Sequence, residues 1–313
     1  MFVPDHVPFN QQEVAFGDPI AAAEYDKQIF DAWVSQLASW AGSSAGLDIL
    51  EIGPGHTLGT QILLAEKGNK VTVADPYPPR WHSAFHPAAY LHLAGLIGGS
   101  PKLEAAAKAS SLDDIGIRRV SDSAEKLSSL RDREFDVVLS NAVLEHVQDI
   151  DRVCAELARV TKLGGTHIHQ IDVGYHNNRE RPLDHLLMTD QEFFAEANAA
   201  HFEYGNRWRA SEFIARFEKV GLVVKYMYVT HRADDEYFLQ AVRQIRNSRR
   251  TYSYWPAEDL RILSFMIVAS RVTAKLRLVS LIKGCAAIAV QKLRKWRRLS
   301  TTRAPRELRQ PSM

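Results

Sequence analysis

The chain has 313 residues, 46% of them hydrophobic, which is enough to bury one large domain or two small ones. Its N-terminus, MFVPDHVPFNQQEV, lacks a basic region followed by an apolar one, so we do not expect a signal peptide. The two cysteines, Cys154 and Cys285, have no metal-ligand spacing and indicate a reduced, cytoplasmic setting.

The net charge of +2 hides an asymmetry. Residues 272–313 hold eleven of the 39 basic residues and one of the 37 acidic residues, so the first 271 residues carry a charge of about −8. This mildly acidic body argues against a nucleic-acid groove across the main domain, and we expect no nucleic-acid partner. It also sets the tail apart as a separate feature.

Strand-like runs alternate with helical ones from about residue 25 to 175, which is typical of a parallel sheet covered by helices. The strands that we expect are 47–52, 71–74, 117–120, 135–139, 167–173, 222–230 and 262–269. The helices that we expect are 25–40, 58–67, 86–99, 151–161 and 211–220. The sequence therefore predicts an α/β fold with a seven-stranded, mostly parallel sheet and helices on both faces.

This pattern divides the chain into three parts. We expect an N-terminal extension over 1–27, the α/β domain over 28–271 and a basic helical tail over 272–313. The domain contains two insertions, at about 78–113 and 174–208. The second insertion is polar and rich in aromatic residues, which suits a lid or a segment that faces a substrate.

The stretch LDILEIGPGHTLGT, residues 47–60, predicts a buried strand, a tight glycine turn and a helix. A dinucleotide site with G-x-G-x-x-G spacing is the main competitor, but the third glycine, Gly59, comes one residue late. Pro54 also removes one amide donor for a pyrophosphate, and Glu51 would repel phosphates. An acid at this place favours a ligand with a cationic end, such as S-adenosylmethionine.

Here the chain resembles the class I S-adenosylmethionine-dependent methyltransferases, over about residues 28–270. The resemblance implies a Rossmann-like fold and cofactor contacts from four strand ends. It places Glu51 near the methionine ammonium group and Asp75, in VTVADPY, on the ribose hydroxyls. It implies that Asp122, with the adjacent Ser123, accepts from the adenine amino group. The remaining residues that it implies at the cofactor are Gly53, Gly55, and Ser140 with Asn141.

Each of these residues also has a purely structural interpretation. The two glycines could form an ordinary tight turn, and Asp75 could be a solvated acid at a strand end. Asp122 could cap a helix that runs through Leu130, and Glu51 could be a structural acid. The convergence of four segments on the carboxyl ends of the strands favours the cofactor site.

The segment SNAVLEHV, residues 140–147, indicates the class of acceptor. Enzymes that methylate amino groups of nucleic-acid bases usually have an Asp or Asn followed by two prolines and an aromatic residue. In this chain Asn141 is followed by AVLEHV, and the segment resembles the small-molecule branch instead. His146 is the candidate general base, because imidazole titrates near neutrality. Alternatively, His146 begins a helix and bonds to backbone, and alignment alone drives methyl transfer.

Two later segments suggest a polar substrate. HQIDVGYH and HFEYGNRWRASEF resemble parts of methyltransferases associated with surface-polysaccharide synthesis, over about 165–225. The implied substrate-binding residues are His169, Asp172, His176 and Arg207. The two histidines and Asp172 could also ligate a metal, but their spacing matches no closed metal site, so we expect none. Arg207 could equally belong to an ordinary surface loop.

The sequence thus predicts an S-adenosylmethionine-dependent methyltransferase that methylates a hydroxyl of a sugar or polysaccharide precursor. The alternatives are a C- or N-methyltransferase of a lipid or metabolite, and a non-catalytic S-adenosylmethionine-binding scaffold. A nicotinamide-dependent oxidoreductase is disfavoured by Glu51 and the late Gly59.

The tail raises a separate hypothesis. Apolar residues recur at helical spacing over 272–299, and basic residues surround Trp296. The apolar stretch is too short to span a bilayer, which needs about 20 residues. Such a helix could lie on the inner face of a membrane as a peripheral anchor, suited to a lipid-linked sugar. The alternative is a helix packed on the domain, followed by a basic end.

Overall fold

Seven strands form one sheet in a computed structural model that describes residues 17–199 and 206–272. In chain order they are β1 (Asp48–Ile52), β2 (Lys70–Ala74), β3 (Arg118–Val120), β4 (Phe135–Asn141), β5 (Thr161–Asp172), β6 (Leu222–Arg232) and β7 (Ile262–Arg271). Their order across the sheet is β3-β2-β1-β4-β5-β7-β6, and only β7 runs antiparallel to its neighbours. The predicted mostly parallel, Rossmann-like fold is confirmed, with every expected strand present.

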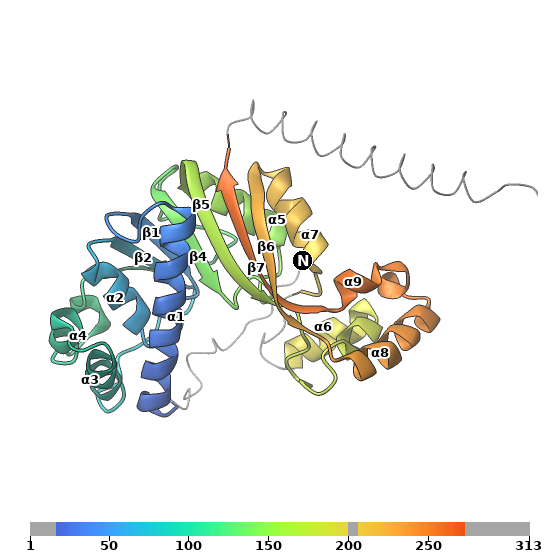
Figure 1. The fold of residues 1–313 in the computed structure, drawn as a ribbon, viewed down its shortest axis with the longest axis horizontal. Helices are drawn as coiled ribbons and strands as arrows, with labels where there is room; N and C mark the ends of the chain where they lie inside the picture. Colours follow the sequence, from blue (N-terminus) through green and yellow to red (C-terminus); the bar gives the residue numbers. More distant parts are fainter. Residues whose placement is uncertain (1–16, 200–205, 273–313) are drawn as a thin grey trace, which may run out of the picture. The chain divides into compact units, whose positions relative to one another are not determined.

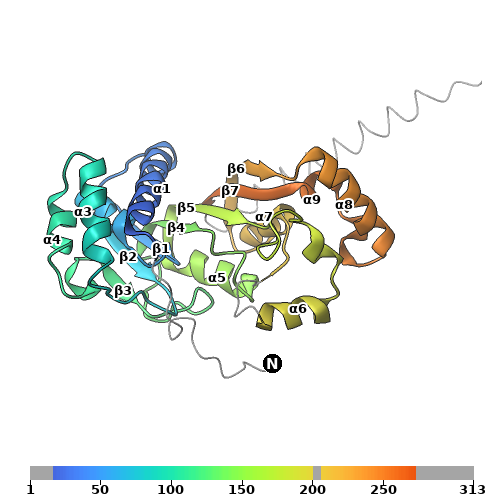
Figure 2. The ribbon, with the colours of Figure 1, turned by 90° about the horizontal axis from the view of Figure 1, so that it is seen from below.

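Helices cover both faces of this sheet. In chain order they are α1 (Pro19–Trp40), α2 (Gly59–Glu66), α3 (His86–Leu96), α4 (Pro101–Ala106), α5 (Ile150–Val160), α6 (Asp190–Ala199), α7 (Ala210–Lys219), α8 (Asp235–Ser248) and α9 (Ala257–Leu260). Figure 2 shows α1 and α5 on opposite faces of the sheet. Helix α1 begins earlier than the expected Tyr25, because Pro19 occupies its first turn and the Asp18 carboxylate accepts the amide hydrogen of Ile20.

The sheet separates two apolar cores. On one face, Trp33 and Leu37 of α1 pack with Ile62 of α2 and with Val137 of β4. On the other face, α5 and α7 pack their apolar sides against the alternate residues of the same strands. Strand β1 lies between β2 and β4, and its residues contribute to both cores, Ile49 to one and Leu50 and Ile52 to the other, which explains its nearly continuous apolar run.

A third apolar cluster, formed partly by the second insertion, lies outside these two cores. Leu183 and Leu186, at the short helix η3 (Asp184–Leu187), pack with Ala241 and Ile245 of α8. Figure 1 groups α6, α8 and α9 at one end of the sheet. We name this group, with η3 and the 3-10 helix η4 (Thr251–Tyr254), the cap. The sequence analysis missed α8, although Asp234 caps it by accepting from the amides of Glu236 and Tyr237.

Some predicted segments lie outside the described residues. These are residues 1–16, residues 200–205 and the basic tail from residue 273 onward, so the proposed membrane helix stays a prediction. Among the helices of the described part of the chain, none is both long and apolar enough to cross a membrane.

Arg209 joins the cap to the sheet. Its side chain is fully buried, and its guanidinium group donates to the carbonyl oxygens of Val173, Asp259 and Leu260 at 3.1–3.2 Å, and also to that of Ile262. Burial lowers the pKa of this arginine, and the charge of Asp259 opposes that effect. Four carbonyl groups from two segments therefore depend on one side chain.

We predict that Arg209→Leu lowers the free energy of unfolding by about 3 kcal/mol or more, because it leaves buried carbonyl groups without donors. Urea unfolding of the full-length protein measures this change. The control is Arg152→Leu at an exposed position of α5, which we expect to alter stability by less than about 0.5 kcal/mol. Equal effects of the two substitutions would contradict the bracing role of Arg209.

Candidate functional site

Parallel pairing brings four strand ends to one edge of the sheet. Ile52 of β1 lies opposite Ala74 of β2 and Ser140 of β4, and Ser140 lies opposite His169 of β5. The segments that follow these residues are therefore neighbours. Ligands of open α/β sheets bind outside this carboxyl edge, so the predicted cofactor residues occupy the expected region.

The glycine loop after β1 adopts a conformation that favours glycine. Gly53 and Gly55 have φ angles of 60° and 74°, and the Gly53 amide donates to the Ala74 carbonyl at 3.0 Å. A Cβ atom at Gly53 would lie 2.5 Å from Cγ2 of Val143. The glycine loop therefore packs directly against the segment 142–147, which carries Glu145 and His146.

Glu51 is buried on the α1 face of the sheet. Its side chain accepts a 2.7 Å hydrogen bond from Nε2 of Gln61. Burial raises its pKa to about 7; Gln61 and Trp33 oppose this rise, and the charge of Asp26 adds to it. A cationic ligand group would stabilise the ionised carboxylate, as expected for the ammonium group of S-adenosylmethionine.

Asp26 is a second buried acid, which the sequence analysis missed. From α1 it reaches the start of α2, where its Oδ1 accepts from the Thr57 hydroxyl at 2.8 Å. A Cβ atom on Gly59 would lie 2.3 Å from its Oδ2, and burial raises its pKa to about 6. A carboxylate thus occupies the helix N-terminus that a dinucleotide phosphate would need, which disfavours the oxidoreductase alternative.

The two acids expected at the ribose and adenine follow β2 and β3. Asp75 is partly buried and accepts the Tyr77 amide hydrogen at 2.7 Å; burial raises its pKa to about 6. Asp122 closes its own loop by accepting from the amide and hydroxyl of Ser129, and no helix follows it. Ser123 beside it is half-buried. These positions are compatible with the predicted contacts and stay predictions.

Ser140 and His169 lie inside the protein. The Ser140 hydroxyl is 2.8 Å from Nδ1 of His169, whose Nε2 is 3.3 Å from Nδ1 of His167. The chain of polar groups ends at Thr161, 3.0 Å from Nε2 of His167. All four side chains are fully buried, and burial lowers the pKa of His169 to about 3.

This arrangement corrects the prediction that the His169 side chain reaches the substrate. Strand alternation turns it toward α7, where it contacts Phe217, and the side chain of Ser140 points the same way. Asn141, one residue later, points to the α1 face and donates to the Tyr25 hydroxyl at 2.7 Å. Of this neighbouring pair, only Asn141 therefore presents its side chain on the face that holds Glu51.

Glu145, His146 and His176 come together beyond β4 and β5. One potential ligand atom from each lies within 4.8 Å of the other two, and the two imidazole centroids are 5.1 Å apart. Asp172 is adjacent, with its Oδ2 3.8 Å from Nε2 of His176. Together with His185 and Asn206, three of these residues line a cavity of about 20 Å³. The structure thus brings Glu145, His146, Asp172 and His176 together, and their roles in catalysis and substrate binding stay predictions.

The segment NRWRAS, residues 206–211, supports this cluster through hydrogen bonds. Asn206 donates to the carbonyls of Leu144 and Val147 at 2.8 Å each, which fixes the turn that holds Glu145. Arg207 donates to the Met188 carbonyl at 2.8 Å and pairs with Asp190; its side chain is only 8% exposed. Arg207 therefore holds the second insertion in place, and its guanidinium group is already committed to protein partners.

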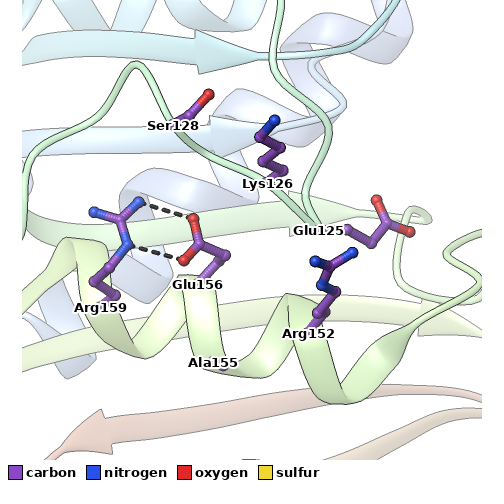
Figure 3. Close-up of a pocket in the computed structure, with 7 residues that line it drawn as sticks. All are labelled: Glu125, Lys126, Ser128, Arg152, Ala155, Glu156 and Arg159. Atoms are coloured by element: carbon purple, nitrogen blue, oxygen red, sulfur yellow. Dashed lines mark hydrogen bonds and ion pairs between the residues drawn. The ribbon is translucent and has the colours of Figure 1, made fainter.

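Two larger cavities lie elsewhere. Figure 3 shows one of about 390 Å³ beside α5, where Arg159 and Glu156 pair at 2.8 Å. Another, of about 490 Å³, is lined by residues such as Asp48 and Lys70 that begin strands. Neither lies among the residues at the carboxyl edge, so neither fits the predicted cofactor site.

Comparison with known proteins identifies the domain. Residues 50–169 match the family model described as "Methyltransferase domain". This range contains the glycine loop, the acids that follow β2 and β3, and the segment with Glu145 and His146. The predicted class I methyltransferase domain is confirmed, and with it the enzyme class and its cofactor, S-adenosylmethionine. No curated protein matches the chain.

Solved structures with a similar fold share little sequence with this chain. A candidate sarcosine dimethylglycine methyltransferase from Galdieria sulphuraria is 12% identical with a TM-score of 0.48, over 82% of this chain and 91% of that one. Phosphoethanolamine N-methyltransferase 2 from Haemonchus contortus, in complex with S-adenosyl-L-methionine, is 15% identical with a TM-score of 0.45, over 81% and 57%. These values are too low to indicate an acceptor.

The pKa of Glu51 predicts a pH-dependent stability. Between its ordinary value of 4.5 and about 7, the folded chain keeps a proton that the unfolded chain releases, so stability falls as the pH rises through this window. Glu51→Gln cannot ionise. We therefore expect it to raise the free energy of unfolding of the ligand-free protein by roughly 1–3 kcal/mol at pH 8, and by much less at pH 4.5.

Urea unfolding at the two pH values measures this difference. Glu104→Gln on the exposed side of α4 is the matched control, and we expect it to behave alike at both pH values. A Glu51→Gln protein with no added stability at pH 8 would show that ionisation of the Glu51 carboxyl group does not destabilise the folded chain.

Proposed function

Because residues 50–169 belong to the methyltransferase-domain family, we propose that the protein transfers the methyl group of S-adenosylmethionine to a hydroxyl of a small polar acceptor, such as a sugar or polysaccharide precursor. The observation that carries this proposal is the cluster of Glu145, His146 and His176, held against the glycine loop by Val143. The donor residues and the acceptor residues thus lie on adjoining segments.

The donor site would work through charge and hydrogen bonding. Glu51 faces the methionine ammonium group, and Asp75 accepts from the two ribose hydroxyls. Asp122 and Ser123 would receive the adenine end. Transfer then needs the acceptor atom aligned with the methyl carbon: the new bond to that carbon forms while its bond to sulfur breaks, and S-adenosylhomocysteine leaves.

The acceptor cluster favours a hydroxyl. A cavity of about 20 Å³ has room for one group of the size of a water molecule and not for a bulky methylated ammonium group. Imidazole and carboxylate groups can hold a hydroxyl and receive its proton. The two acids, Glu145 and Asp172, would also attract a primary amine, so N-methylation is the second candidate.

We expect Asp75→Ala to weaken S-adenosylmethionine binding about tenfold or more, since losing charge-assisted hydrogen bonds costs roughly 1.5–3 kcal/mol. Calorimetric titration of the full-length protein measures this, with Asp31→Ala at an exposed position of α1 as the control. A folded Asp75→Ala protein with an unchanged dissociation constant would refute the assignment. Binding of NAD instead of the methyl donor would refute the proposed function.

His146→Ala should lower turnover roughly 10²–10⁴-fold while leaving the affinity for S-adenosylmethionine unchanged. Turnover is followed with donor labelled at the methyl group and a polar cell extract, and mass spectrometry assigns the product as a methyl ether or a methylamine. A loss of less than about threefold would mean that alignment alone drives the reaction. A labelled methylamine as the product would show that the acceptor is an amine and not a hydroxyl.

A further inference from the structure

The carboxyl group of Glu145, in the acceptor cluster, is buried without close hydrogen-bond donors in the part of the chain that the structure describes. Glu145 is 5% exposed, and within the described residues neither oxygen of its carboxyl group accepts a hydrogen bond of ordinary geometry. A buried carboxyl group with no close donor is costly unless a cation or a proton satisfies it.

The imidazoles beside Glu145 are ligands of the right kind. Nε2 of His146 lies 3.8 Å from Oε1 of Glu145, and Nε2 of His176 is buried without a hydrogen-bond partner among the described residues. Ligand atoms that share one zinc ion at about 2.0–2.2 Å lie roughly 3–4 Å apart. Since the three atoms here are already within 4.8 Å of one another, small side-chain rotations would close the site.

The cluster is also supported and reachable. Asn206 holds both ends of the turn that carries Glu145 and His146, and its own amide donates to the Glu145 carbonyl at 3.0 Å. Asp172 gives His176 a neighbouring carboxylate. The side chains of His146 and His176 are 32% and 20% exposed, which provides an entry path from solvent.

We propose that Glu145, His146 and His176 bind one divalent transition-metal ion, with zinc as the type ion. Two nitrogen ligands and one oxygen ligand suit Zn²⁺, Co²⁺ or Mn²⁺, whereas Mg²⁺ and Ca²⁺ prefer oxygen alone. Three protein ligands leave a position open, as in catalytic zinc sites. The site shares only His176 with the ligand set considered in the sequence: His169 is buried elsewhere, and Glu145 and His146 take the places of His169 and Asp172.

The catalytic role of this metal ion rests on the proposed function, methyl transfer to a hydroxyl. The acceptor oxygen would take the open position, where the ion makes its hydroxyl group more acidic. The oxygen then loses its proton to solvent and bonds to the methyl carbon, while the electrons of the carbon–sulfur bond pass to sulfur. His146 serves as a ligand in this scheme, and the ion takes over the task of the general base.

The test begins with metal binding alone. Full-length protein without a histidine tag is stripped with a chelator and titrated with ZnCl₂ by calorimetry, and with CoCl₂ by visible absorption. We expect one saturable zinc equivalent, cobalt bands of a protein-ligated ion, and no comparable response to MgCl₂. Glu145→Gln and His176→Ala should each weaken zinc binding by more than roughly 100-fold, since losing supporting partners alone costs 10–100-fold.

His231→Ala, an exposed histidine of β6, is the matched control and should bind zinc as the unaltered protein does. Thermal unfolding without metal checks that each variant folds; Glu145→Gln keeps the shape of the side chain and removes only the charge. The proposal is overturned if the unaltered protein shows no saturable equivalent, or if both cluster variants bind zinc normally.

The two proposals can fail separately. Methyl transfer to a hydroxyl that persists in chelator-treated protein would refute the catalytic role of the ion and leave the proposed function standing. Stoichiometric zinc binding that depends on Glu145, combined with S-adenosylmethionine binding but labelled methylamine as the product, would keep the metal site and replace the acceptor.

Discussion

The site depends on keeping acids at the carboxyl edge of the sheet without cationic side chains to pair with them. Burial is the main cause of the raised pKa values of Glu51, Asp26, Asp75 and Glu145, and among the described residues no lysine or arginine forms an ion pair with any of them. Each acid costs stability when it is ionised in the folded chain. A ligand that carries positive charge relieves that cost, so the affinity for cations is built into the fold.

This constraint explains why the same edge suits a sulfonium cofactor and disfavours a dinucleotide. Asp26 covers the start of α2, where a helix would otherwise attract phosphate, and Glu51 faces the α1 side of the glycine loop. Both are held by neutral donors, Thr57 and Gln61, which fix their positions without neutralising them. The donor site therefore selects its ligand mainly by charge.

Much of the fold could be predicted from the sequence, because β1, β2 and β4 are buried apolar runs and the turns after β1 and β2 begin with Gly53 and Asp75. The direction of single side chains could not. Ile52 pairs with Ser140, so Ser140 shares the α5 face with Ile52 while Glu51 and Asn141 point to the other face. Which face a residue takes depends on strand register, which the local pattern of SNAVLEHV does not contain.

The roles of the polar residues at 206–209 also could not be predicted from the sequence. Arg207 looks like a substrate ligand in the sequence, because the sequence does not distinguish an arginine that binds a ligand from one that binds a backbone carbonyl. In the structure, Asn206, Arg207 and Arg209 tie the turn of Glu145, the segment 185–190 and the segment 259–262 to one another.

The acceptor cluster is therefore assembled from two sources. Glu145 and His146 come from the methyltransferase domain that the family model covers, while His176 and His185 come from the second insertion. Positions 142–147 are fixed by their packing against Gly53, so they cannot move without disturbing the donor site. The insertion contacts this turn through His176, whose ring lies beside that of His146, and through the hydrogen bonds of Asn206. Under the proposed function, substitutions in the insertion would change the choice of acceptor and preserve methyl-donor binding.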